Sequence, residues 1–272
     1  MEVCYRHPKR ETGVACSNCG RPICPECMTP TPVGMRCPEC ARQRTRVRTA
    51  RTLAVEPTVT YALIAINVIV FLAELATGAG AVSGGLSASS VIQHGALSRA
   101  TVADGEVWRV VTAGFLHAGF LHIAFNMYAL YILGQMLEPA IGHLRFALIY
   151  FVSLLAGSFG ALLLSPTGLT LGASGAVFGV MAAGILILRS RGINPMQTGL
   201  PLFLGLNLLL TFTVSGISIG GHLGGIAGGG LAALVLFELG ERRRISRLVP
   251  ILLLVGLGVV AVVGSIAVSQ SG

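Results

Sequence analysis

Beyond residue 40 the sequence contains no cysteine, and its only aspartate is Asp104. Charged residues make up 11% of the 272 positions, whereas a soluble domain carries about a quarter. Hydrophobic residues reach 53%. This scarcity of charge excludes an ordinary soluble domain as the main part of the chain, and it predicts that most of the protein is solvated by lipid.

The cysteines and much of the charge are concentrated near the N-terminus. All seven cysteines lie at or before Cys40, and ten of the nineteen Lys and Arg residues lie at or before Arg51. We therefore divide the chain into a Cys-rich unit at 1–41, a basic linker at 42–57 and a long apolar body. The net charge of +8 does not predict a nucleic-acid partner, because basic residues beside apolar spans are explained as a topology signal.

Four pairs of metal-ligating residues occupy the Cys-rich unit, and two residues separate the members of each pair. The pairs are Cys4 and His7, Cys16 and Cys19, Cys24 and Cys27, and Cys37 and Cys40. Zinc takes four S or N ligands in a tetrahedron, so eight ligands match two closed structural sites. Metal binding would supply the folding free energy that so small a unit cannot obtain from an apolar core.

A disulfide framework is the competing interpretation of these cysteines. Their odd number and the pairing of His7 with Cys4 argue against it. Thiolate ligands would place the unit in the reducing cytosol. Spacing alone leaves both sequential and interleaved pairing open.

The Cys-rich unit resembles B-box and related cross-braced zinc fingers over residues 4–40. That resemblance implies that the first and third pairs share one zinc ion, and that the second and fourth pairs share the other. It also suggests a binding or regulatory task, with a cytosolic protein as one possible partner.

Seven apolar runs follow the linker and are the expected membrane spans. They lie at 58–76, 119–138, 145–164, 174–190, 198–214, 220–238 and 249–268. With a cytosolic N-terminus, the arginines after residue 41 fall on the inside, except for Arg99 and Arg109. The C-terminus is then outside. No secretory signal pattern is visible in the first 40 residues, and we expect a bacterial inner membrane.

Four polar side chains stand at similar depth in the outer turns of the second, fourth and sixth spans. They are His122, Asn126, Ser174 and His222. Intramembrane polar residues are costly and tend to mark function. Serine is a poor nucleophile unless a neighbouring imidazole takes its proton, so the sequence predicts Ser174 as nucleophile and His222 as base.

No carboxylate lies near this depth, which favours a Ser–His dyad over a triad. We expect His222 to be oriented by packing, with Phe178 as the candidate. Oxyanion donors would be the side chains of His122 and Asn126 and the backbone N–H of Ser174. Asn207 is expected to form a hydrogen bond between helices.

Glycines spaced four apart line the two spans that carry the dyad. Gly175 and Gly179 lie on one span, and Gly221, Gly225 and Gly229 lie on the other. Such faces allow helix backbones to approach closely, which a Ser–His hydrogen bond between two helices requires.

Together these motifs resemble those of the rhomboid family over residues 58–240. The matching segments are Trp108-Arg109, His117-x4-His122-x3-Asn126, Gly172-Ala173-Ser174-Gly175 and Gly221-His222-Leu223-Gly224-Gly225. The resemblance implies a six-helix all-α membrane bundle with an additional seventh helix at 249–268. It also implies serine proteolysis of transmembrane substrates by Ser174 and His222, with His122 and Asn126 at the oxyanion and Trp108-Arg109 placing the first outer loop. His117 is expected to hydrogen-bond within that loop.

Two other functions remain as alternatives. The first is a catalytically silent rhomboid-like adaptor that binds transmembrane helices and a cytosolic partner. The second is a transporter, which would be expected to show charged residues near the midplane or paired broken helices. Neither pattern is clear in this sequence.

Overall fold

The computed structural model describes residues 2–42, 56–78, 89–165, 168–241, 246 and 248–271. The chain forms two compact units, Met1–Ala54 and Val55–Gly272. Several predicted features lie outside the described residues. These are the linker arginines after Arg42, the Gly- and Ser-rich start of the first outer loop, and the four arginines between 242 and 247.

The N-terminal unit consists of two small hairpins and two short helical turns. β1 (Glu2–Val3) pairs antiparallel with β2 (Glu11–Thr12), and β3 (Thr29–Thr31) pairs antiparallel with β4 (Gly34–Arg36). A 3₁₀ turn at Pro25–Cys27 and helix α1 (Pro38–Arg42) complete it. Its buried core is Ile23 surrounded by six of the seven cysteines. So small an apolar core explains why the unit would depend on metal for stability.

The second unit is mainly helical in its described residues, with one isolated antiparallel bridge between Leu97 and Thr170. Its long apolar helices are α3 (Thr58–Ala76), α7 (Phe120–Ile141), α8 (His143–Leu164), α9 (Ser174–Ser190), α10 (Leu200–Thr213), α11 (Ile219–Ala233) and α12 (Leu248–Gln270). A π-helical segment, η4 (Leu234–Glu241), continues α11. The connections hold the short helices α4 (Ser90–Gly95), α5 (Arg99–Ala103) and α6 (Arg109–Thr112) and the 3₁₀ turns η2 (Ala113–Phe115) and η3 (Pro195–Thr198).

The seven expected spans coincide with these helices to within three residues at each end. Among the described residues, five helices are long and apolar enough to cross a membrane unaided, with α11 and η4 forming one of them. The other two, α9 and α10, have 17 and 14 residues. At 1.5 Å per residue they extend only about 25 and 21 Å. The expected all-α polytopic fold is therefore confirmed, with two of its helices short.

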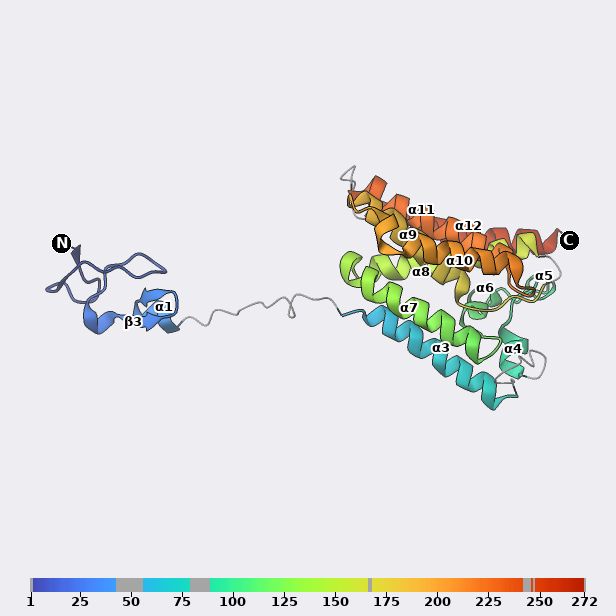
Figure 1. Ribbon diagram of the computed structural model, residues 1–272, viewed down its shortest axis with the longest axis horizontal. Helices are drawn as coiled ribbons and strands as arrows, with labels where there is room; N and C mark the ends of the chain where they lie inside the picture. The colour runs from blue at the N-terminus through green and yellow to red at the C-terminus, as the bar shows by residue number, and fades with distance from the viewer. Residues whose placement is uncertain are drawn as a thin grey trace. The chain divides into compact units, whose positions relative to one another are not determined.

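Helix α8 lies at the centre of the bundle and packs against α9, α11 and α12. Helices α3 and α7 lie side by side on one flank, and α4, α5 and α6 gather at the end where α12 terminates (Figure 1). The first residues of α7, α9 and α11 lie toward this same end (Figure 1). Polar residues in the first turns of those three helices are therefore brought to one level.

Glycine determines how closely α8, α9 and α11 approach one another. A Cβ added at Gly225 would lie 2.0 Å from the Gly175 carbonyl oxygen, and one at Gly229 would lie 2.1 Å from the Gly179 carbonyl oxygen. The predicted glycine contact between α9 and α11 is thus confirmed. Helix α8 makes an equivalent contact that the spacing did not reveal, because a Cβ at Gly160 would lie 2.3 Å from the Gly220 carbonyl oxygen.

Replacing Gly225 by alanine is expected to destabilise the bundle by about 1–3 kcal/mol, because the methyl group forces α9 and α11 apart. Gly256 on α12 is the matched control, since a Cβ there meets nothing within 4 Å. Thermal unfolding in detergent should show a lower midpoint for Gly225→Ala and an unchanged or higher one for Gly256→Ala. Equal midpoints for the two variants would contradict the proposed role of this contact.

Candidate active site

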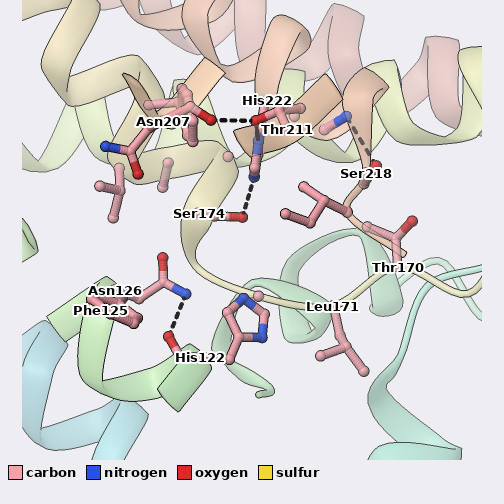
Figure 2. A pocket seen from close by; sticks show the side chains of 18 of the residues that line it. His122, Phe125, Asn126, Thr170, Leu171, Ser174, Asn207, Thr211, Ser218 and His222 are labelled. Atoms are coloured by element: carbon pink, nitrogen blue, oxygen red, sulfur yellow. Dashed lines mark hydrogen bonds between the residues drawn. The ribbon is translucent and has the colours of Figure 1, made fainter. Parts of the chain in front are cut away.

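Ser174 and His222 lie next to each other although 48 residues separate them in the chain. The Nε2 atom of His222 is 2.8 Å from Ser174 Oγ, within hydrogen-bonding distance (Figure 2). Ser174 is the first residue of α9, and His222 lies in the first turn of α11. The close glycine contact between these two helices makes so short a distance possible. An imidazole in this position can take the proton of the serine hydroxyl.

Two neighbours fix the imidazole of His222. The ring of Phe178 is stacked on it, with centroids 4.0 Å apart and an interplanar angle of 20°. On the other side Thr211 Oγ1 lies 2.7 Å from His222 Nδ1. The packing against Phe178 agrees with the arrangement expected from the sequence. The Thr211 contact was missed, because threonines within apolar helices usually bond their own backbone and give no signal of a distant partner.

His122 and Asn126 face Ser174 across the cavity from the first turns of α7 (Figure 2). The backbone N–H of Ala118 donates to His122 Nδ1 at 3.3 Å, so Nδ1 carries no proton. In the neutral ring the proton is therefore on Nε2, which makes this atom a donor. Asn126 Nδ2 donates to the His122 carbonyl at 3.0 Å, which leaves its second N–H available.

Gly172 provides the space in which these donors converge. Its φ of +127° favours glycine, and an added Cβ would lie 2.8 Å from His122 Nε2 and 3.7 Å from Ser174 Oγ. The backbone N–H of Ser174 lies in the first turn of α9, where helix N–H groups have no intrahelical partner. Three potential donors thus surround the region beside Ser174 Oγ.

Trp108 and Arg109 lie in the loop that precedes α7. The guanidinium of Arg109 is buried and donates to the carbonyls of Gln93 and Ala96 at 2.7 and 2.8 Å, and it also pairs with Glu106. Trp108 is exposed, and its indole N–H donates to the His94 carbonyl at 3.2 Å. Arg109 thus holds the loop together from within, while Trp108 covers its outer side.

A cavity of about 810 Å³ opens onto Ser174 and His222. Its walls come from α7, α9, α10, the start of α11 and the segment Leu169–Gly172. Phe125, Phe203, Leu206 and Leu210 supply much of its apolar surface. This volume lies within the range of sites that hold a ligand of drug or short-peptide size.

The expectations for two neighbouring polar residues have different outcomes. The ring of His117 is buried and interacts with the Phe115 backbone in the same loop at a geometry looser than a full hydrogen bond, while its backbone N–H donates to the Glu74 carboxylate. Asn207 bonds within its own helix, to the Phe203 carbonyl, and not between helices. An i−4 carbonyl one turn away satisfies an amide at lower entropic cost than a neighbouring helix does.

The N-terminal unit contains two clusters of metal-ligating side chains. One joins Cys4, His7, Cys24 and Cys27, and the other joins Cys16, Cys19, Cys37 and Cys40. The first pair thus meets the third and the second meets the fourth, which is the interleaved arrangement implied by the B-box resemblance. Both clusters could hold a metal ion.

The spacing of the ligand atoms fits zinc. Tetrahedral bonds of about 2.3 Å place two sulfurs about 3.8 Å apart, and an imidazole nitrogen about 3.6 Å from a sulfur. Cys19 and Cys37 Sγ are 3.9 Å apart, and His7 Nδ1 lies 3.3–3.8 Å from the sulfurs of its cluster.

Cationic and N–H donors surround the four-cysteine cluster and offset its negative charge. Arg21 Nε donates to Cys19 Sγ at 3.3 Å, and the Cys37 N–H donates to Cys16 Sγ at 3.2 Å. The Cys37 bond is the main cause that lowers the pKa of the Cys16 thiol to about 6. Thiolates are the forms that bind metal, so this hydrogen bond favours ligation by Cys16.

The fold and the site define a multi-pass integral membrane protein with a serine–imidazole pair at a cavity between its helices. A family model described as the rhomboid domain matches residues 104–239, half of the chain. The chain belongs to the rhomboid family.

Curated relatives agree with this assignment, and most of them are named as proteases or rhomboid-like proteins. Rhomboid protease GluP of Bacillus subtilis is 34% identical over 184 residues, which are 66% of this chain and 35% of that protein. Putative rhomboid protease YdcA of the same organism is 34% identical over 146 residues, 52% of this chain and 73% of that protein. Rhomboid-like protease 1 of Toxoplasma gondii is 36% identical over 152 residues, 52% of this chain and 50% of that protein. The chain thus spans about a third of the length of GluP.

Proposed function

We propose that this protein is an intramembrane serine endopeptidase that cleaves transmembrane segments of other membrane proteins. The observation that carries the proposal is the 2.8 Å contact between Ser174 Oγ and His222 Nε2 at a cavity between membrane helices. Membership of a family in which several curated relatives are named proteases supports it.

In this mechanism Ser174 Oγ attacks the carbonyl carbon of the scissile peptide bond while its proton passes to His222 Nε2. The resulting oxyanion accepts hydrogen bonds from His122 Nε2, Asn126 Nδ2 and the Ser174 N–H. When the tetrahedral intermediate collapses, the C–N bond breaks and the leaving amine takes the proton from His222. Water then attacks the acyl-serine ester, with His222 as base, and restores Ser174.

A substrate helix hides its carbonyl groups in its own hydrogen bonds, so it must unwind locally before Ser174 can reach one. We therefore place cleavage near the outer end of the substrate span, at small residues beside helix breakers such as Gly or Pro. The cavity is lined by Phe125 of α7 and Phe203 of α10, and such apolar walls suit an unwound segment with apolar side chains.

We further propose how the chain is organised around this activity. Residues 1–41 form a zinc-binding domain with two structural ions, 42–57 a linker, 58–240 the protease core and 249–268 a seventh span. The thiolate ligands and the distribution of arginines support a cytosolic N-terminus and an outside C-terminus. We propose a bacterial plasma membrane as the location of the protein. A cytosolic protein is the proposed partner of the zinc domain.

A catalytically silent adaptor is the second candidate. It would bind transmembrane helices in the same cavity without chemistry, and the 2.8 Å contact between the Ser174 hydroxyl and an imidazole nitrogen argues against it.

The test is to reconstitute the full chain in lipid vesicles with a panel of single-span reporters and, in parallel, to treat it with a fluorophosphonate probe. We expect cleavage of at least one reporter within its span, and covalent labelling mapped to the peptide that contains Ser174. Binding of reporters without cleavage or labelling would instead identify an adaptor.

A further inference from the structure

The hydroxyl of Thr211 is the one described side chain that hydrogen-bonds His222 Nδ1, at 2.7 Å (Figure 2). Thr211 is 2% exposed and lies near the end of α10, whereas His222 lies on α11. No carboxylate among the described residues bonds this nitrogen, the position that aspartate occupies in a Ser–His–Asp triad. The contact therefore stands where an orienting group is required.

The direction of the hydrogen bond follows from the other partner of Thr211. Its Oγ1 donates to the Asn207 carbonyl at 2.8 Å, one turn earlier in the same helix. A hydroxyl has a single proton, so Oγ1 must accept the bond from His222 Nδ1–H. In a neutral ring Nε2 is then unprotonated, and it accepts from the Ser174 hydroxyl 2.8 Å away. This is the tautomer that a general base needs.

Helix α10 has few fully buried residues, although Leu204 and Leu208 are partly buried against the main core. Of its 14 residues only Leu200, at its start, and Thr211 are buried. Most of its large side chains are exposed, namely Leu202, Phe203, Leu206, Leu209, Leu210 and Phe212. Phe203, Leu206 and Leu210 also line the cavity. Thr211 is thus the one fully buried polar residue of this helix, and it lies in the wall of the cavity.

We propose that Thr211 is the positioning residue of His222, so that a hydroxyl on α10 orients the base on α11. Thr211 holds the proton of His222 on Nδ1 and leaves Nε2 ready for Ser174. The proposal rests on the proposed proteolytic function, which it deepens by naming what replaces the triad carboxylate.

Thr211→Val removes the hydroxyl and keeps the shape, whereas Thr211→Ser keeps the hydroxyl. Thr213→Val is the matched control, because Thr213 lies on the same helix and bonds the Leu209 carbonyl in the same way, but it is exposed and outside the cavity. We expect Thr211→Val to lower kcat and the rate of fluorophosphonate labelling about 10-fold at nearly constant KM. Thr211→Ser should recover most of the loss, and Thr213→Val should match the wild type.

A structural role alone would not produce this pattern. Wild-type rates in Thr211→Val would overturn the proposal, and so would equal impairment of the Ser and Val variants, since the hydroxyl would then be irrelevant. If every variant with a reduced kcat also has a lower thermal unfolding midpoint, the loss of activity reflects a folding defect. That result would likewise contradict a positioning role.

A second measurement does not depend on activity. Nitrogen-15 NMR of histidine-labelled full chain in lipid bilayers distinguishes Nδ1–H from Nε2–H rings, and the His222→Gln spectrum identifies the signal of His222 among the six histidines. We expect Nδ1–H in the wild type, in Thr211→Ser and in Thr213→Val, and its loss in Thr211→Val. An Nε2–H ring in the wild type would overturn the Thr211 proposal whether or not the protein cleaves reporters. An Nδ1–H ring in a protein that never labels or cleaves would contradict only the proposed function.

Discussion

Replacing Ser174 by alanine is expected to reduce reporter cleavage by at least about 10⁴-fold, because among the described residues no other hydroxyl hydrogen-bonds His222 Nε2, the nitrogen that acts as base. The effect is measured as the rate at which the full-length protein in lipid vesicles cleaves the reporter that the wild type cleaves most rapidly. His222→Ala should reduce cleavage similarly, because the serine hydroxyl then has no base. The two losses should not add in the double variant, since the residues act as one unit.

Ser190→Ala is the matched control for this experiment. Ser190 ends the helix that Ser174 begins, and its hydroxyl bonds only the Ile187 carbonyl of that helix. Its loss should leave cleavage close to the wild-type rate. Substantial cleavage by Ser174→Ala, with the protein folded as judged by its thermal midpoint, would remove the proposed nucleophile.

The nucleophile and base could be expected from the sequence because a residue in a membrane span is placed by its depth in the bilayer and by the direction in which the span runs. Once the spans alternate, the beginnings of three helices must lie at one level, and His122, Ser174 and His222 fall there together. Lipid also makes polar residues conspicuous, since few are tolerated without a role. The spacing of the glycines then indicated which two of these helices approach each other closely.

The orientation of His222 could only be predicted in part. The contact of Phe178 could be predicted because Phe178 lies one turn after Ser174 on the same helix face. The contact of Thr211 could not be predicted, because it depends on how α10 docks against α11, and hydropathy does not determine that. The role of Gly160 on α8 was also hidden, since the two glycines of that helix, Gly157 and Gly160, are three residues apart and lack the four-residue spacing seen on α9 and α11.

The interleaved clusters of the N-terminal unit illustrate a related limit. Eight ligands in four pairs establish the number of sites but not which pairs meet, because every pair has the same local geometry. The folded chain brings Cys4 to Cys24 and Cys16 to Cys37, so the segments of the two sites cross one another. Each cluster therefore constrains the loops that carry the other.

Removal of metal is accordingly expected to unfold the N-terminal unit as a whole and to spare the membrane helices. Structural zinc supplies about 10–16 kcal/mol of folding free energy per site, far more than burial of Ile23 and its neighbours can replace. The full chain in detergent should contain about two zinc ions before treatment with a strong chelator. After treatment, limited proteolysis followed by mass spectrometry should show rapid cutting within residues 2–42 and continued protection of α7 to α11.

Cys19→Ser should have a similar effect from a single substitution. Loss of one ligand opens the four-cysteine cluster, and because the segments cross, the zinc content should fall below one ion per chain and the whole unit should become sensitive to protease. Val33→Ser is the matched control, since Val33 is exposed in the same unit and is not a ligand. A Cys19→Ser chain that retains one tightly bound ion and a protected first hairpin would show that the two sites fold independently.

The proposed reaction uses only side chains of the protease core. If chelation abolishes reporter cleavage while α7 to α11 stay protected from proteolysis, the N-terminal unit must therefore control the activity of that core.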